Sequence, residues 1–257
     1  MIRDFVRRHA RGLVLLAAAA VALALAGCGA GLLPSARTET DRLKLARRMM
    51  ADRDYMQAIE MLKTYIVNNG GSADVDEAIV LYGECALRTR DWATATVEFE
   101  RVLRDFPESD SAAAASFMLG EAHFGQSRPP DFDQEYTEKA LVQWQSYLAN
   151  YPNHWRHAEA ERRVADAEAR IATKLVHTGN LYLKLNSFKP ARVYFNRVLD
   201  EFPNTPQVAE AMIGLALVDA RIGIKDRAIE RLKEVETRWK GTPIGNRAIA
   251  ERARIEH

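Results

Sequence analysis

The sequence has few of the residues that interrupt helices, with 14 glycines and 9 prolines among 257 residues. It has only two cysteines, Cys28 and Cys85, which excludes a scaffold held together by several disulfide bonds. Neither sign of charge dominates, because 36 lysines and arginines face 35 aspartates and glutamates. A strongly basic face for nucleic acid is therefore not expected. No stretch alternates apolar and polar residues as a half-buried strand does, so the composition favours a helical protein.

The sequence also lacks the motifs of common catalytic sites: HExxH, GxSxG, a phosphate-binding glycine loop and CxxC. His154 and His157 are three residues apart, but they lie in a charged stretch without a third histidine, which favours a solvated helix face over a metal site. Four acidic residues lack the Asp-x-Asp-x-Asp-Gly spacing of a calcium loop, namely Asp131, Asp133, Glu135 and Glu138. We expect a protein that is not an enzyme and has no metal or cofactor.

One stretch, residues 179–203, has the spacing of a tetratricopeptide (TPR) repeat. It contains Gly179-x2-Tyr182, then Ala191-x3-Phe195, and ends at Pro203. A TPR unit is a pair of antiparallel helices of about 34 residues. Gly179 and Ala191 are small because we expect the two helices to cross there, and the two aromatic residues fill the space around the crossing.

The same spacing recurs along the chain. A small residue precedes an alanine by 12 positions at Ala46 and Ala58, Gly83 and Ala95, Gly179 and Ala191, and Ala216 and Ala228. Gly120 and Ala140 are 20 apart, the same interval with an insertion of 8. The fourth residue after each alanine is large and apolar: Leu62, Phe99, Trp144, Phe195 and Leu232. The sequence predicts an all-α fold, a right-handed superhelical solenoid of five TPR helix pairs with a C-terminal capping helix.

The predicted repeats cover about residues 41–69, 74–107, 109–152, 155–203 and 206–241, and the final helix covers 243–255. Residues 125–133 read as a loop inside the third repeat, and the helical pattern of 153–184 fits one long helix or two with a break. We predict N-cap side chains at Asp91, Ser187, Thr205 and Thr242. Pro190 lies in a predicted first helical turn, and Pro206 and Pro243 are predicted at first helical positions.

The first 27 residues have the pattern of a signal peptide. Four arginines precede an uncharged apolar run of 14 residues, which is shorter than the roughly 20 residues of a membrane-spanning helix. The run ends in Leu25-Ala26-Gly27-Cys28, which resembles the lipobox of bacterial lipoproteins. Cys28 is then the lipidated, palmitate-bearing residue, and residues 28–40 form a tether. A plain secretory signal or an N-terminal anchor is the alternative. Cys85 reads as a small core residue.

The inner wall of a TPR array is built from the first helices of successive pairs. The predicted wall positions are Leu43, Arg47, Met50, Val80, Glu84, Leu87, Phe117, Glu121 and Phe124. Their mixture of apolar and charged side chains suits an extended or helical peptide held by apolar anchors. Arg47 is expected to pair with the carboxylate of such a peptide. The alternative for each position is a place in the core between repeats.

Three segments resemble the BamD family of outer-membrane lipoproteins. Asp133-Gln134-Glu135-Tyr136-Thr137, followed by Lys139-Ala140, looks like the start of that family's third repeat. Tyr151-Pro152-Asn153 precedes the long helical pattern, and Phe202-Pro203-Asn204-Thr205 leads into Glu210-Ala211. The resemblance covers nearly the whole chain after Cys28. The first repeat departs from the family pattern, because Gly70-Gly71 stands where an aromatic residue and a proline are expected.

The resemblance implies a non-enzymatic, lipid-anchored subunit of the β-barrel assembly (BAM) machinery on the periplasmic face of the outer membrane. Its implied partners are the periplasmic domains of a BamA-like barrel subunit, the C-terminal segments of unfolded outer-membrane proteins, and other assembly lipoproteins. Gly29 after the lipobox cysteine permits export to the outer membrane. The alternative is another periplasmic TPR adaptor lipoprotein, such as a pilotin-like factor for secretin assembly. A periplasmic hydrolase would need a catalytic cluster that the sequence does not display.

Overall fold

The computed structural model describes residues 39–257. The predicted signal peptide and Cys28 lie outside the described residues. The chain divides into two compact units, Met1–Leu45 and Ala46–His257. The described part of the first unit is the beginning of helix α2.

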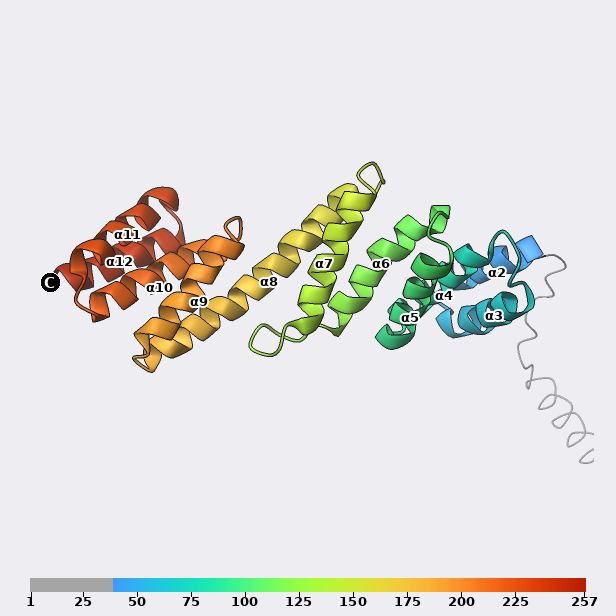
Figure 1. The fold of residues 1–257 in the computed structure, drawn as a ribbon, viewed down its shortest axis with the longest axis horizontal. Helices are drawn as coiled ribbons and strands as arrows, with labels where there is room; N and C mark the ends of the chain where they lie inside the picture. Colours follow the sequence, from blue (N-terminus) through green and yellow to red (C-terminus); the bar gives the residue numbers. More distant parts are fainter. Residues whose placement is uncertain (1–38) are drawn as a thin grey trace, which may run out of the picture. The chain divides into compact units, whose positions relative to one another are not determined.

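The described residues form eleven helices and no strand, which confirms the all-α prediction. Helix α2 covers Glu39–Ala51 and is followed by ten further helices (Figure 1). These are α3 (Tyr55–Asn68), α4 (Val75–Arg88), α5 (Trp92–Asp105), α6 (Asp110–Gln126), α7 (Glu135–Asn150), α8 (His157–Lys184), α9 (Phe188–Glu201), α10 (Gln207–Arg221), α11 (Lys225–Arg238) and α12 (Pro243–Glu256).

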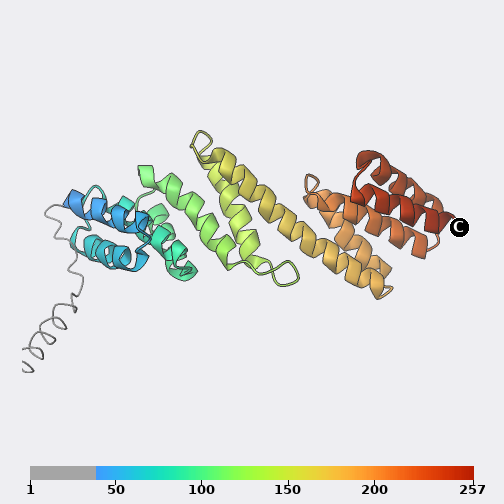
Figure 2. The ribbon, with the colours of Figure 1, turned by 180° about the vertical axis from the view of Figure 1, so that it is seen from behind.

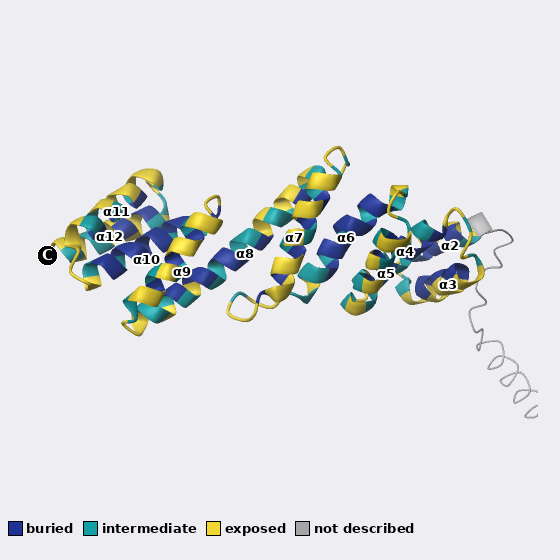
Figure 3. Cartoon of the chain, viewed as in Figure 1, coloured by how far each residue is buried: buried dark blue, intermediate teal, exposed yellow. Residues whose placement is uncertain are grey.

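From α3 onward, each helix packs against the next one along the chain. Helices two apart also pack, as α4 does on α6, α8 on α10, and α10 on α12. This is the arrangement of TPR helix pairs, in which first helices form one layer and second helices another. Most helices accordingly have both buried and exposed residues, whereas α10 is buried along most of its length (Figure 3).

The large residue of each repeat fills the space beside a small one. Phe99, Trp144 and Phe195 are fully buried, as are Leu62 and Leu232 in the outer repeats. A Cβ atom built on Gly83 would be 2.6 Å from the ring of Phe99, and one built on Gly120 would be 2.3 Å from Trp144. These contacts are too short for real side chains, so glycine is the residue that lets each pair of helices approach.

At the crossing of α8 and α9, the ring of Phe195 lies directly against Gly179. A Cβ atom on Gly179 would have three atoms of the Phe195 ring as its nearest neighbours, the first at 2.6 Å. The ring of Phe195, and not the methyl group of Ala191, therefore limits the size of residue 179. Ala191 is itself fully buried.

Two of the four predicted caps are confirmed. Asp91 accepts a hydrogen bond from the backbone N–H of Thr94, and Thr242 accepts one from Gly245 just before Pro243 begins α12. In both helices the donor is the third helical residue. The residue at this third position also explains why Ser187 does not cap α9.

Ser187 lies at the N-cap of α9, but its hydroxyl makes no capping bond. The third residue of that helix is Pro190, which has no N–H to donate. The prediction for Thr205 was also wrong, because α10 begins at Gln207 with Pro206 as its N-cap. The Thr205 hydroxyl instead donates to the Phe202 carbonyl, at 2.9 Å.

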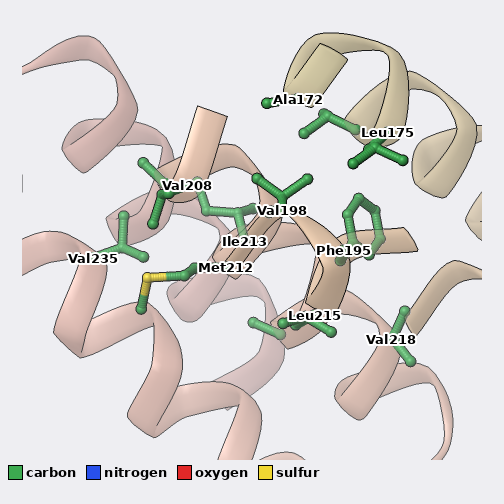
Figure 4. Close-up of a cluster of buried hydrophobic side chains, with 14 of the residues drawn as sticks. Ala172, Leu175, Phe195, Val198, Val208, Met212, Ile213, Leu215, Val218 and Val235 are labelled. Carbon is green, nitrogen blue, oxygen red and sulfur yellow. The ribbon is translucent and has the colours of Figure 1, made fainter. Parts of the chain in front are cut away.

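Residues 157–184 form a single helix of 28 residues, which settles the alternative left open by the sequence. At 1.5 Å per residue, α8 is about 42 Å long. It lies beside α7 at its start and beside α9 at its end, as both ribbon views show (Figure 2). Ala160 and Ala167 belong to the hydrophobic core that α8 forms with α6 and α7. Leu175 and Val176 join the core of the last repeats (Figure 4).

Cys85 is fully buried on α4 and is free, as expected of a small core residue. Among residues 39–257, no helix has both the length and the apolar composition that a membrane span requires.

Candidate functional site

Five of the nine predicted wall residues line one cavity of about 450 Å³ between α4, α6 and the start of α8. They are Glu84, Leu87, Phe117, Glu121 and Phe124. The first two come from α4 and the other three from α6, so two consecutive first helices supply them. The remaining lining residues were not predicted as wall positions and are Arg88, Trp92, Met118, Gly125, Arg156, Glu159 and Arg163.

The other four predicted wall residues do not line this cavity. Leu43 and Val80 are buried, so they are core residues. Met50 is half-buried on α2. Arg47 forms an ion pair with Glu77 of α4, so its charge is already paired. A peptide carboxylate would have to displace that of Glu77, and the expected contact between Arg47 and a peptide stays a prediction.

The apolar side of the cavity is held in place by close packing. Phe117 meets the ring of Tyr147 edge-on at 5.5 Å, and Phe124 lies 5.4 Å from Trp144. Gly125 allows the ring of Trp92 to lie across α6, since a Cβ atom there would be 2.7 Å from that ring. Gly125 was predicted to belong to a loop, but α6 extends to Gln126 and makes it a helical residue.

The start of α8 brings three charged residues to the opposite side. The Arg163 guanidinium donates from Nη2 to Glu121 Oε2 at 2.9 Å. Its Nε lies 2.7 Å from Oε1 of the same carboxylate, a contact without hydrogen-bond alignment. Arg156 lies 3.6 Å from Glu159. Its guanidinium also rests on the ring of Phe117, 4.9 Å from the centroid.

Glu84 differs from the other carboxylates of the cavity. Within residues 39–257 it makes no hydrogen bond and no ion pair, although it is half-buried on α4. Burial raises the pKa of Glu84, and the nearby charges of Arg156 and Arg88 only partly oppose that shift. Burial also raises the pKa of Glu121, in spite of its pairing with Arg163. The cavity thus combines apolar walls with desolvated carboxyl groups.

Three of the residues considered as metal ligands are engaged in separate contacts. Asp131 lies 2.6 Å from His177 Nδ1, and Glu135 lies 2.6 Å from Lys139. The hydroxyl of Tyr147 lies 2.6 Å from Nδ1 of His154. In the part of the chain that the structure describes, no three His, Cys, Asp or Glu side chains are grouped so that they can hold a metal ion.

The loop between α6 and α7 is organised by Gln134, which the sequence did not single out. Its Nε2 donates to the carbonyls of Pro129 at 2.9 Å and Phe132 at 3.1 Å, while its Oε1 accepts from Thr137 at 2.8 Å. Lys174 of α8 donates to the Asp131 carbonyl at 2.6 Å. The loop is therefore joined to the long helix that also borders the cavity.

Comparison with known families gives two matches. Residues 84–235 match the YfiO family, described as outer membrane lipoprotein, and residues 43–109 match a tetratricopeptide repeat family. The first match includes every lining residue of the cavity. The chain is 25% identical over 233 residues to the outer membrane protein assembly factor BamD of Caulobacter vibrioides, a match that covers 89% of this chain and 75% of that protein.

Solved structures with similar folds include PilW, a type IV pilus biogenesis factor, and a TPR protein of Thermus thermophilus. PilW is 13% identical with a TM-score of 0.41, and the match covers 84% of this chain and all of PilW. The Thermus protein is 17% identical with a TM-score of 0.38, and the match covers 83% of this chain and 98% of that one.

Proposed function

Because the chain belongs to the YfiO family of outer-membrane lipoproteins, we propose that it is a non-enzymatic lipoprotein subunit of the β-barrel assembly (BAM) machinery. The observation that carries this proposal is the family match over α4 to α11, together with the BamD relative over most of the chain. An array of helix pairs without a grouped set of metal ligands in residues 39–257 fits a binding subunit.

The cavity between α4, α6 and α8 is where this subunit receives an extended segment of an unfolded β-barrel client. Its volume of about 450 Å³ is in the range of ligand pockets, roughly 300–1,000 Å³. Leu87 and Phe124 supply apolar contacts, while Glu84 and Glu121 supply polar ones. Arg47, the client contact expected from the sequence, does not line this cavity and is paired with Glu77.

The carboxy-terminal repeats dock on the periplasmic domains of a BamA-like barrel subunit. A second cavity of about 690 Å³ lies along α9, with Phe188, Val193 and Ile222 as apolar lining. Val193 and Ile222 are exposed by 57% and 41% and lie together in this lining. The lining has two cations: Arg192 is paired with Asp219, whereas Lys189 forms no ion pair among residues 39–257, so an acidic group of the partner fits opposite Lys189.

Affinity purification from solubilised membranes tests the docking surface and the complex together. We expect the wild-type chain to recover the barrel subunit and Val193→Asp to lose it. Val97→Asp is the matched control, because Val97 is equally exposed, at 60%, but lies on α5. Recovery of a secretin in place of a barrel subunit would instead identify a secretin assembly factor.

Cys28, outside the described residues, is the proposed lipid anchor that holds the protein at the periplasmic face of the outer membrane. Its basis is the lipobox Leu25-Ala26-Gly27-Cys28. With lipid attached, each buried methylene contributes about 0.8 kcal/mol to membrane binding. Cys28→Ala should lose the lipid label and leave the membrane fraction. A variant that stays wholly with the outer membrane without a label would show that other contacts retain it.

A further inference from the structure

Some charged residues of the cavity between α4, α6 and α8 have partners within the protein, and one does not. Arg163 is engaged by Glu121 at 2.7 and 2.9 Å. Arg156 faces Glu159 and is covered by two aromatic rings, Phe117 on one side and Trp155 at 4.5 Å. The two arginines contributed by the start of α8 therefore have partners within the protein.

Glu84 remains without such a partner. Of the carboxylates in the lining, it is the one that makes no ion pair within residues 39–257. Arg88, one turn further along α4, has an exposed side chain and forms no ion pair with it. A partly desolvated carboxylate without a hydrogen-bond donor from the protein is less favourable than a fully hydrated one, so a ligand that supplies a donor gains from this group.

We propose that this cavity selects a basic side chain, an arginine or lysine of an extended client segment, whose cation pairs with Glu84. A neighbouring apolar side chain of the same segment packs on Leu87 and Met118, which line the cavity beside it. The proposal rests on the proposed function, because it takes a client segment as the occupant. It adds the chemistry that this segment must carry.

The arrangement of charges favours a cation over an anion or a metal ion. A carboxylate entering the cavity would have to compete with Glu121 for Arg163 and with Glu159 for Arg156, although the Nε of each arginine has no hydrogen-bond partner within residues 39–257. A metal ion would need several ligands, whereas no suitable group of three occurs in the described chain. A guanidinium or ammonium group needs only one carboxylate for a charge-assisted hydrogen bond.

The test uses two fluorescent peptides of alternating apolar and polar residues that differ at one central position. One peptide has arginine there and the other has citrulline, a neutral group of nearly the same shape. Fluorescence anisotropy measures the affinity of each peptide for the wild-type chain, for Glu84→Gln and for Glu168→Gln. Glu168 is the matched control, since it is half-buried on α8 with a pKa raised by burial but does not line the cavity.

We expect the exchange of arginine for citrulline to weaken binding to the wild-type chain on the order of tenfold. Glu84→Gln should weaken the arginine peptide by a similar factor and leave the citrulline peptide unchanged, while Glu168→Gln changes neither. Equal affinity of both peptides for the wild type, or an arginine peptide insensitive to Glu84→Gln, overturns this inference and leaves the client-binding function standing. Failure of both peptides to bind the wild type overturns the client-binding function and this inference with it.

Discussion

The ring of Phe195 lies so close to Gly214 that a Cβ atom at position 214 would be 2.4 Å from its Cζ. Gly179 lies almost as close, with 2.6 Å between its would-be Cβ and Cε1 of the same ring. Phe195 belongs to α9, and the two glycines belong to α8 and α10, which pack on each other as well. The approach of three helices thus depends on two missing side chains.

Gly214→Ala should destabilise the protein by about 1–3 kcal/mol, because the added methyl group overpacks against a fully buried ring. Denaturation with urea measures the change in the free energy of unfolding. Gly71→Ala is the control, since a Cβ atom there meets no atom within 4 Å. It should change stability by no more than about 1 kcal/mol.

The same substitution in a Phe195→Leu chain separates overpacking against the ring from an effect on the helix itself. Phe195→Leu removes ring atoms that the new methyl group would meet, so Gly214→Ala should cost less in that background than in the wild type. Equal costs in both backgrounds would show that the ring of Phe195 is not what excludes a side chain at residue 214.

The repeat pattern found Gly179 but not Gly214. Within one helix pair, the interval between small residues and the large residue that follows is fixed, so Gly179 and Phe195 could be assigned from the sequence. Gly214 touches Phe195 from the next repeat. Such a contact depends on how consecutive pairs stack, which a pattern internal to each pair does not specify. The same pattern had placed Ala216 at the corresponding position.

The residues of the candidate site were predicted or missed for the same reason. Glu84 and Glu121 were predicted because both lie on first helices, at positions that the repeat phase assigns to the inner wall. Arg156 and Arg163 were missed because they reach the cavity from the start of α8, across a turn whose geometry the repeat pattern does not describe. The pairing of Arg47 was missed for a similar reason, since Glu77 lies on another helix.

Asp219 of α10 holds three arginines from two neighbouring helices. It is 2% exposed and accepts from Arg192 of α9 at 2.8 Å, from Arg227 of α11 at 2.6 and 2.8 Å, and from Arg231 at 3.2 Å. Asp219→Asn keeps the size of the side chain but removes the charge on which these cations converge. Loss of one member of a fully buried ionic group costs about 3–5 kcal/mol, and the cost here should lie below that range because the arginines are 32–41% exposed.

Urea denaturation of Asp219→Asn should therefore show a clear loss of stability. Glu201→Gln provides the comparison, because it breaks an exposed pair with Arg197 one turn away. Such a surface pair contributes about 0.3–0.5 kcal/mol. If the two variants lose the same small amount, the arginines around Asp219 are held by solvent and packing and not by its charge.

Cys85 should be chemically inert in the folded protein. Burial, followed by the nearby charge of Glu84, raises the pKa of its thiol to about 12. At pH 8 only about one thiol in ten thousand is then the reactive thiolate. Mass spectrometry after iodoacetamide treatment of a Cys28→Ala chain should find little alkylation until denaturant is added. Comparable alkylation with and without denaturant would show that the α4 core opens readily.

Glu84 should lower the stability of the free protein at neutral pH. Burial raises its pKa above the ordinary value of 4.5 that applies in the unfolded chain. A raised carboxyl pKa means that the folded state disfavours the charged form, so this cost is present above the folded-state pKa. The cost disappears as the pH falls through that pKa to the ordinary value, because the folded chain binds the proton at a higher pH than the unfolded chain does.

Glu84→Gln should consequently be more stable than the wild type at pH 7, and the difference should close as the pH approaches 4.5. Thermal unfolding of both chains across this range measures the difference. Glu60→Gln, at an exposed glutamate of α3, should show no comparable dependence. A variant less stable than the wild type at pH 7 would mean that Glu84 supports the fold. A stabilising substitution that also removes selectivity for the arginine peptide would show that Glu84 serves binding at the expense of stability.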